Sequence, residues 1–426
     1  MKDIAIIGAG YVGLTTAACF AKMGHHVVLS EIDRAKAELI QTGISPIFEN
    51  GLSELLSDVV SSGHLSVTND NVEAASTSDL VFICLPTPQD ADGSANTDVV
   101  FEVIDSISLA LTSRSVLITK STMPIGSVKK IQSLVRHTGA NVAANPEFLR
   151  EGTAVQDTLH PERVVIGCDD KNSADRIAEL YVSLNSQVFI TDPQSAELIK
   201  YASNAFLATK VTFINSVARL CDAVGADIES VSQALGSDSR IGNKFLKPGP
   251  GWGGSCFPKD TSALLHQSSE NGHSFKLLDA VISGNLEHQL DIVQQIESLL
   301  AEHGGKSVAV LGLTFKAGTD DLRDSPALFI VQQLLGSGFI INVYDPTVST
   351  NSNPSLNSIN VCSSATEAAQ ASDLLVVLTE WPEFSELTPS DLGEVMVNRH
   401  VFDTRGIINK DIWKKSGFTV KILGRP

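Results

Sequence analysis

Short apolar runs alternate with segments of helical periodicity at both ends of the chain. Four such runs lie in the first third: IAIIG (4–8), HVVLSE (26–31), LVFICLP (80–86) and SVLITKS (115–121). Four more follow residue 306: SVAVLGLTF (307–315), FIINVYDP (339–346), DLLVVLTEW (373–381) and HVFDTRG (400–406). Continuous apolar strands that alternate with helices are typical of βαβ units, in which the strands pair in parallel. The sequence therefore predicts an α/β protein with two Rossmann-like domains on parallel sheets.

The middle of the chain has a helical pattern. Residues 195–224 contain no Gly or Pro and are followed by Gly225, which predicts one long helix of roughly 45 Å. Further helical segments continue to about residue 303 around one glycine-rich loop. Because 426 residues exceed one ordinary core, we expect three domains: a Rossmann-like domain over 1–194, a helical domain over 195–304 and a second Rossmann-like domain over 305–426.

The charge balance limits the possible partners. There are 49 acidic and 31 basic residues, a net charge of -18, so the molecule as a whole repels nucleic acid and anionic membranes. No apolar stretch approaches the roughly 20 residues of a membrane span, and MKDIAIIGAG at the start has no signal-peptide pattern, so a cytoplasmic location is expected. The six cysteines (19, 84, 168, 221, 256 and 362) lack zinc-ligand spacing, which predicts reduced thiols and no metal site.

The stretch GAGYVG follows the first predicted strand and opens a helix. Gly8, Gly10 and Gly13 have the spacing of a dinucleotide-binding turn, in which they allow a tight turn, close approach of the pyrophosphate and close helix–strand packing. The phosphates would lie at the helix N-terminus. Glu31 ends the second strand, where its carboxylate would bind ribose hydroxyls and repel a 2′-phosphate. This favours NAD over NADP, although nearby Arg34 weakens the preference.

The long helix carries a polar pair within an apolar sequence. Lys200 and Asn204 are spaced i, i+4 and therefore share one face. Apolar residues precede and follow both of them. A solvated stripe that happens to contain a lysine would explain this pattern when it is taken alone.

The segment NPEFLRE (145–151) has the pattern of a helix start. Asn145 would be the N-cap, followed by proline at the first helical position. This arrangement would place Glu147 and Glu151 on one helical face. Glutamates in a first helical turn are common on protein surfaces, so this pattern alone is also weak.

The glycine-rich loop GPGWGGSCFPKD (249–260) places one thiol before a predicted helix. Pro258 suits a first helical turn, so Cys256 would lie where the helix dipole and free N–H groups favour a thiolate, and Lys259 would assist. Asp260 would position a water or orient Lys200. The preceding glycines would leave the sulfur open to a substrate. A buried structural cysteine beside a tight turn is the alternative. A reactive thiol and NAD together suggest oxidation of an alcohol to an aldehyde, then to a thioester, and release of an acid.

Several sequence blocks occur in order through nearly the whole chain. They are GAGYVG, LPTP (85–88), KSTMPIG (120–126), NPEFLREG (145–152), ELIKYASNAF (197–206), RIGNKFLKPGPGWGGSCFPKD (240–260) and GLTFKAGTDDLRDSP (312–326). With these blocks the chain resembles the UDP-glucose/GDP-mannose dehydrogenase family, and most closely its UDP-glucose branch. The resemblance implies that 1–194 bind NAD, that 195–304 carry the catalytic Lys and Cys, and that 305–426 bind the UDP-sugar. It also implies a homodimer paired through the long central helix.

The resemblance assigns roles to individual residues. Cys256 would be the nucleophile, while Lys200 and Asn204 would hold the C6 oxygen of the sugar and stabilise developing negative charge. Thr122, Glu147 and Asp260 would handle water and protons. Cofactor contacts would come from Gly8, Gly10, Tyr11, Val12, Gly13, Glu31, Thr87, Thr122, Glu151 and Arg323. Substrate contacts would come from Glu147, Phe148, Leu149, Lys200, Asn204, Arg240, Phe245, Leu246, Gly253, Lys316 and Arg405.

The expected reaction is the NAD-dependent oxidation of UDP-glucose to UDP-glucuronate, with two NADH formed per sugar. The alternatives within the family are a UDP-N-acetylhexosamine or GDP-mannose dehydrogenase. A two-electron dehydrogenase of the β-hydroxyacid type shares the layout but would not need Cys256 and would form one NADH. A catalytically silent NAD-binding sensor would have no use for the whole set of Cys256, Lys200, Asn204 and Asp260.

Overall fold

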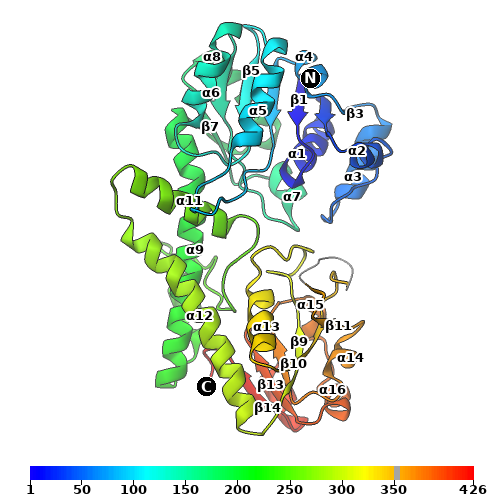
Figure 1. Cartoon of the computed structure of the whole chain (residues 1–426), viewed down its shortest axis with the longest axis vertical. Coiled ribbons are helices and arrows are strands. Elements are labelled where there is room, and N and C mark those ends of the chain that lie inside the picture. Colours follow the sequence, from blue (N-terminus) through cyan, green and yellow to red (C-terminus); the bar gives the residue numbers. More distant parts are fainter. Residues whose placement is uncertain (350–355) are drawn as a thin grey trace. The chain divides into compact units, whose positions relative to one another are not determined.

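The computed structural model describes residues 1–349 and 356–426, which divide into two compact units (Figure 1). The first unit comprises residues 1–203 and 262–274, and the second comprises residues 204–261 and 275–426. Each unit is built around one sheet. The predicted α/β class with two Rossmann-like domains is confirmed.

The first unit contains an eight-stranded sheet in the order β3-β2-β1-β4-β5-β6-β7-β8. The strands are β1 (Asp3–Ile7), β2 (His26–Ser30), β3 (Leu65–Thr68), β4 (Leu80–Ile83), β5 (Val116–Thr119), β6 (Asn141–Ala144), β7 (Arg163–Gly167) and β8 (Gln187–Thr191). β6 and β7 are antiparallel, while the other neighbouring strands run in parallel. The carboxyl ends of β1, β4 and β5 therefore meet at one edge, where nucleotides bind in such sheets.

Helices cover both faces of this sheet, as the upper part of Figure 1 shows. They are α1 (Tyr11–Lys22), α2 (Arg34–Gln41), α3 (Leu52–Ser61), α4 (Asn71–Ser76), α5 (Asp98–Ile107), α6 (Ser127–Val135), α7 (Ala154–Leu159) and α8 (Lys171–Ala178). Short 3₁₀ segments follow three of them at Ser108–Ala110, Arg136–Thr138 and Glu179–Leu184. Coverage on both faces explains why β1, β4 and β5 are almost wholly apolar.

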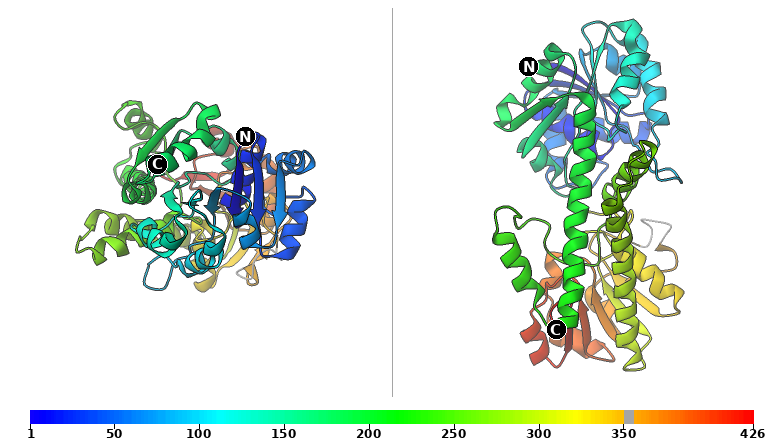
Figure 2. Two further views of the ribbon diagram at one scale, coloured as in Figure 1. Left: turned by 90° about the horizontal axis from the view of Figure 1, so that it is seen from above. Right: turned by 90° about the vertical axis from the view of Figure 1, so that its left-hand side faces the viewer.

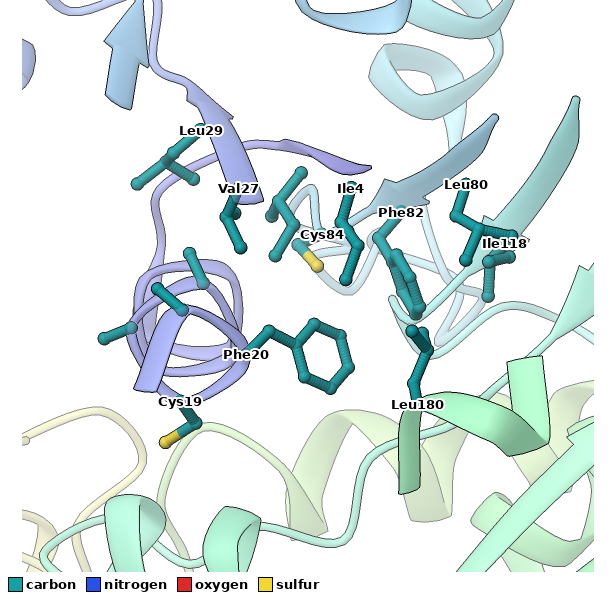
Figure 3. Close-up of a cluster of buried hydrophobic side chains, with 14 of the residues drawn as sticks. Ile4, Cys19, Phe20, Val27, Leu29, Leu80, Phe82, Cys84, Ile118 and Leu180 are labelled. Atoms are coloured by element: carbon teal, nitrogen blue, oxygen red, sulfur yellow. The ribbon is translucent and has the colours of Figure 1, made fainter. Parts of the chain in front are cut away.

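Phe20 is at the centre of the core between α1 and the sheet. Its side chain is fully buried, and its ring packs edge-on against Phe82 at 5.4 Å and Tyr181 at 5.6 Å between ring centroids. Figure 3 shows this ring extending from α1 toward Phe82 and Leu180. The contact joins α1, β4 and the segment after α8 into one core.

The second unit contains a six-stranded parallel sheet in the order β11-β10-β9-β12-β13-β14. Its strands are β9 (Ser307–Leu311), β10 (Ile340–Tyr344), β11 (Asn360–Val361), β12 (Leu374–Val377), β13 (His400–Asp403) and β14 (Thr419–Ile422). Its own helices are α10 (Ile228–Ser237), α12 (Lys276–Ala301), α13 (Pro326–Gly336), α14 (Ala365–Ala369), α15 (Pro382–Ser385), α16 (Pro389–Val395) and α17 (Lys410–Lys415).

Two helices belong partly to each unit. α9 (Pro193–Val224) is continuous over 32 residues, in agreement with the helix predicted over 195–224 (Figure 2). α11 (Phe257–Glu270) begins directly after Cys256, as the sequence predicts. Among the described residues, no helix is both long and apolar enough to cross a membrane.

Replacing Phe20 with alanine is expected to lower the free energy of unfolding of the first unit by about 3–5 kcal/mol, because the truncation leaves a cavity between helix and sheet. Val182, which is largely exposed in the same unit, provides the matched control, with an expected change within about 0.5 kcal/mol for Val182→Ala. Urea denaturation of both variants measures the difference. Equal losses for the two variants would contradict this packing.

Candidate active site

The glycine turn between β1 and α1 has the geometry of a dinucleotide site. Gly8 has φ +98°, and a Cβ there would lie 2.7 Å from the Cys84 carbonyl oxygen. A Cβ at Gly13 would lie 1.9 Å from the Gly8 oxygen, so both glycines are required for the turn and for helix packing. A Cβ at Gly10 would meet no described atom within 4 Å. The start of α1 is therefore open at Gly10, as a pyrophosphate would need.

The carboxylate expected to bind ribose lies at the same edge of the sheet. Glu31 directly follows β2, and its backbone N–H donates to the Thr68 oxygen at 3.0 Å. Its carboxylate accepts from the Asp33 N–H at 3.1 Å and pairs with the Lys36 ammonium at 3.0 Å. Lys36 was not anticipated from the sequence, which pointed to Arg34 as the nearby cation.

Two threonines from neighbouring strands meet at this edge. Thr87 follows β4, and its hydroxyl donates to the Thr122 carbonyl oxygen, beyond β5, at 3.0 Å. Thr87 is buried.

The other residues expected to contact the cofactor lie near α1 and α7. Tyr11 and Val12 are the first two residues of α1. The turn that carries Glu151 precedes α7.

A buried ion pair joins the loop after β6 to α9. The Lys200 ammonium lies 2.8 Å from the Glu147 carboxylate, and both side chains are almost inaccessible. Burial acts to raise the pKa of Glu147, but the charge and hydrogen bond of Lys200 and the Leu149 N–H outweigh it and hold that pKa below its usual value. Glu147 is therefore an ionised acceptor. The Phe148 ring lies beside this pair, with the Arg163 guanidinium 4.0 Å from its centroid.

The helix predicted to begin at Asn145 is wrong. Residues 145–150 are irregular, and the next helix, α7, begins at Ala154. The Asn145 side chain does not cap a helix, because its oxygen accepts from the Tyr181 hydroxyl at 2.6 Å and its amide donates to the Val165 oxygen at 2.8 Å. These long-range bonds hold the segment extended, so Glu147 and Glu151 do not share a helical face.

Two buried charged residues near this loop were missed by sequence reasoning. Lys120, at the end of β5, donates to the Asn145 oxygen at 3.3 Å, and burial lowers its pKa. Glu197, three residues before Lys200, accepts from the N–H groups of Gly126 at 2.5 Å and Val128 at 2.8 Å. Burial raises the pKa of Glu197 to about 7. Both lie within recognisable sequence blocks, KSTMPIG and ELIKYASNAF, but no local pattern predicts their burial.

In the second unit, Cys256 lies at the N-cap of α11. Its carbonyl oxygen accepts from the Asp260 N–H at 2.9 Å, which is the first hydrogen bond of the helix. The Ser255 hydroxyl lies 3.5 Å from the Cys256 sulfur. Cys256 is half-buried, whereas the other five cysteines are buried. The position predicted for the thiol at a helix N-terminus is confirmed.

Asp260 connects the thiol loop with α9 inside the second unit. Its carboxylate accepts from the Asn204 side-chain amide at 2.6 Å and from the Lys259 ammonium at 2.5 Å, and it is almost fully buried. The sequence did not predict this contact, since Asp260 was expected to position a water or orient Lys200, whose ammonium instead pairs with Glu147. Lys259 pairs with Asp260, so its charge is directed toward this carboxylate.

The glycines before Cys256 are packed against protein atoms, in contrast to the open path expected for a substrate. At Gly249 a Cβ would lie 2.8 Å from the Arg405 guanidinium, and at Gly251 it would lie 2.9 Å from the Asn285 oxygen. At Gly253 a Cβ would lie 1.9 Å from the Asp324 oxygen, and at Gly254 it would lie 2.9 Å from the Phe315 ring. The loop backbone is also fixed by hydrogen bonds, since the Gly249 N–H donates to the Asn215 oxygen at 3.0 Å. The glycines therefore let neighbouring segments close around the loop.

Two of the residues expected to bind the sugar nucleotide, Lys316 and Arg405, lie in the second unit. Arg405 donates to the carbonyl oxygens of Leu378 at 2.9 Å and Phe315 at 3.2 Å, and it pairs with Glu380 at 3.0 Å. The Lys316 ammonium lies 5.6 Å from the Phe315 ring centroid. These contacts gather Lys316 and Arg405 at the carboxyl ends of β9, β12 and β13.

The remaining predicted residues occupy loops. Arg240 pairs with Asp238 at 2.6 Å, and Arg323 pairs with Asp321 at 2.8 Å. Phe245 has φ +63°, which is uncommon for a residue with a side chain. The next residue, Leu246, is buried.

Within the described residues, no group of three His, Cys, Asp or Glu side chains could hold a metal ion.

Sequence models of one protein family match three consecutive segments of the chain. They are described as the NAD binding domain (residues 2–185), the central domain (194–287) and the UDP binding domain (309–410) of the UDP-glucose/GDP-mannose dehydrogenase family. The chain belongs to this family. It therefore carries the family's NAD-binding domain and its UDP-binding domain.

Relatives match over nearly the full length. The chain is 39% identical to a UDP-glucose 6-dehydrogenase of Bacillus subtilis (strain 168), over 100% of this chain and 94% of the relative. It is 41% identical to a UDP-glucose 6-dehydrogenase of Rhizobium meliloti (strain 1021), over 99% of each chain. The solved structure of a UDP-glucose dehydrogenase from Pyrobaculum islandicum matches with a TM-score of 0.91 and 32% identity, covering 99% of this chain and 96% of that one.

The six cysteines are expected to differ sharply in reactivity. Burial raises the pKa of Cys19 and of Cys84 to about 12, and it also raises the pKa values of Cys168, Cys221 and Cys362. At pH 8 these five thiols remain protonated and inaccessible. Iodoacetamide should therefore modify Cys256 first, giving one adduct per native chain by mass spectrometry.

Denatured protein serves as the control, because unfolding exposes all six thiols. In the native protein, the Cys256→Ala variant should take up almost no reagent over the same period. If Cys84 or Cys19 were modified as fast as Cys256, the predicted difference in reactivity between Cys256 and the five buried cysteines would be wrong.

Proposed function

We propose that this protein oxidises UDP-glucose at C6 to UDP-glucuronate, with NAD as the hydride acceptor and Cys256 as a covalent nucleophile. The observation that carries the proposal is the half-buried thiol at the N-cap of α11, in a chain that has the NAD-binding and UDP-binding domains of the family. Two full-length relatives named UDP-glucose 6-dehydrogenase support this choice of sugar.

The residues at the edge of the first sheet fit NAD. The open start of α1 at Gly10 accommodates a pyrophosphate, and the Glu31 carboxylate suits free ribose hydroxyls. Two molecules of NAD, bound there in turn, would each accept one hydride. The other cofactor contacts implied by the family resemblance, including those of Thr87, Glu151 and Arg323, remain predictions.

The chemistry proceeds through the Cys256 sulfur. The C6 alcohol first loses a hydride and a proton and becomes an aldehyde. The sulfur then bonds to the aldehyde carbon while the carbonyl oxygen takes up a proton, which gives a thiohemiacetal. Loss of a second hydride and proton leaves a thioester. Water attacks the thioester carbon, the carbon–sulfur bond breaks, and the acid leaves as the thiol is restored. One sugar thus yields two NADH.

Each unit supplies side chains suited to part of this chemistry. In the first unit, Lys200 is a buried cation that could stabilise negative charge on oxygen, and ionised Glu147 holds its ammonium in place. In the second unit, Asp260 orients the Asn204 amide. We propose that Lys200 and Asn204 hold the C6 oxygen, and that Thr122, Glu147 and Asp260 handle water and protons.

The domain limits 1–194, 195–304 and 305–426 also stay predictions, as does the cytoplasmic location.

A homodimer formed through α9 is part of this proposal. Phe206, Phe213 and Leu220 are spaced seven residues apart on α9, and each is more than half exposed, as is Val224. An apolar heptad stripe of this kind packs against another helix. A second copy of the same chain is the partner that we expect, because the stripe runs along one long helix and a two-fold interface is self-complementary.

A panel of sugar nucleotides tests the substrate. With NAD present, UDP-glucose should be turned over fastest and should give two NADH per sugar, because both oxidations occur on one bound substrate. UDP-N-acetylmannosamine, UDP-N-acetylglucosamine and GDP-mannose should give little or no NADH. Absorbance at the nicotinamide band with limiting sugar measures the stoichiometry. Turnover of only an N-acetylated or guanosine sugar would replace UDP-glucose, and one NADH per sugar would favour the two-electron alternative.

The Cys256→Ala variant isolates the covalent step. It should form no UDP-glucuronate, because no thioester can form, while NAD binding measured by titration calorimetry stays as in the unaltered protein. Cys221→Ala, at a buried cysteine of the same unit, is the matched control and should keep acid formation. Two NADH per sugar from the Cys256→Ala variant would refute the covalent mechanism.

Substituting Phe213 with glutamate should shift the protein from dimer to monomer, since a charge would be buried in the centre of the apolar stripe. Light scattering after size-exclusion chromatography measures the molar mass. Val397→Glu, at another exposed apolar position of the second unit, should leave the mass unchanged. If Phe213→Glu remains a dimer, the stripe is not the interface.

A further inference from the structure

The loop before α3 carries a carboxyl group, Glu49, that none of the proposed steps uses. Glu49 is 7% exposed. It lies in the irregular segment between α2 and α3, and it did not stand out in the sequence. A carboxyl group removed from water needs hydrogen-bond donors to compensate for the lost solvation. The segments that supply those donors are the ones that the buried carboxyl group holds together.

The donors to Glu49 come from two separate segments of the first unit. The Tyr11 hydroxyl donates to one carboxyl oxygen, Oε2, which also accepts from the Gly152 N–H at 2.7 Å. The second oxygen, Oε1, accepts from the Ala154 N–H at 2.7 Å. The Gly152 N–H also lies 2.9 Å from the Tyr11 hydroxyl oxygen, so Tyr11, Glu49 and Gly152 all contact one another. The neighbouring Asn50 amide donates to the Gly152 oxygen at 3.0 Å.

Both segments adjoin the cofactor-binding edge. Tyr11 is the first residue of α1 and directly follows Gly10, the glycine at which the helix start is open. The Gly152 N–H belongs to the peptide group that follows Glu151. Glu49 therefore fixes the backbone immediately after Glu151 to the first turn of α1. The two segments are 141 residues apart in sequence, so no local signal holds them together.

We propose that Glu49 is a positioning residue for NAD: it preassembles the turn at Glu151 and the first turn of α1, so that binding the cofactor does not have to order them. This inference rests on the proposed roles of Tyr11 and Glu151 at the cofactor. Ordering a loop on binding reduces affinity, and a group that orders it beforehand restores that affinity. Glu49 touches neither substrate nor reacting atoms in this role.

A purely structural role would be to cap the short helix α7, whose first residue is Ala154. The two roles make different predictions. Loss of a cap lowers the melting temperature and leaves ligand affinities alone, whereas loss of preassembly lowers the affinity for NAD selectively. A stability measurement alone cannot separate them, so the test measures NAD binding and sugar binding in the same variants.

The test variant is Glu49→Gln, which keeps the size of the side chain. Its NH₂ group cannot accept a hydrogen bond, so one backbone N–H loses its partner. The dissociation constant for NAD, measured by titration calorimetry in the full-length protein without sugar, should rise about tenfold. The KM for the sugar nucleotide should change by less than twofold. Glu49→Asp, which retains the charge but is too short to reach both segments, should weaken NAD binding in the same direction.

Asp170→Ala is the matched control, because it removes a helix cap. Asp170 caps α8 by accepting from the Ser173 N–H at 2.7 Å, and it contacts Asn141 at the amino end of β6, the edge opposite the glycine turn. This control should lower the melting temperature without changing NAD affinity. If the folded Glu49 variants bind NAD normally, or lose NAD and sugar affinity equally, the inference is overturned. NAD titration needs no sugar, so a wrong substrate assignment would leave the NAD arm of this test intact.

Discussion

The buried ion pair between Lys200 and Glu147 places the strongest constraint on the first unit. Removing two charges from water costs several kcal/mol for each ion, and only close geometry with further hydrogen bonds compensates for it. The pair meets this requirement with a 2.8 Å contact and a Leu149 N–H on the carboxylate. For Glu147 to reach α9, the chain after β6 must stay extended. The bonds of Asn145 to Tyr181 and Val165 hold it there, at the expense of a helix that the local sequence would otherwise allow.

One continuous helix, α9, anchors several of the segments that we propose to take part in the chemistry. Glu197 on its first turns holds the start of α6, next to the loop of Thr122, while Lys200 holds Glu147. One turn beyond Lys200, Asn204 bonds to Asp260, and Asn215 accepts from the thiol loop. Because each residue advances about 1.5 Å along an unbroken helix, the spacing of these side chains within each unit follows from sequence position. A glycine or proline inside this helix would loosen that spacing. This gives a physical reason why residues 194–224 contain neither.

Features with a local cause could be predicted from the sequence, and features that depend on distant partners could not. The glycine turn, the helix over 195–224 and the helix start after Cys256 follow from backbone freedom, periodicity and capping. The extended course of residues 145–150 depends on Tyr181, which lies 36 residues away. Glu49, Lys120 and Glu197 are ordinary polar residues in sequence, and only the fold shows that they are buried with specific donors or acceptors.

The glycines before Cys256 show how a loop that carries a thiol can be held largely through its backbone. The proposed nucleophile must keep its own side chain available, so the segment that carries it needs other anchors. In this loop, hydrogen bonds to main-chain groups replace such an anchor: Asn285 accepts from the Trp252 N–H and donates to its oxygen, each at 2.9 Å, and His288 contacts the Gly249 oxygen at 2.7 Å. The absence of Cβ atoms lets these partners and Arg405 approach closely. The backbone that carries the sulfur is thereby held by residues outside the loop.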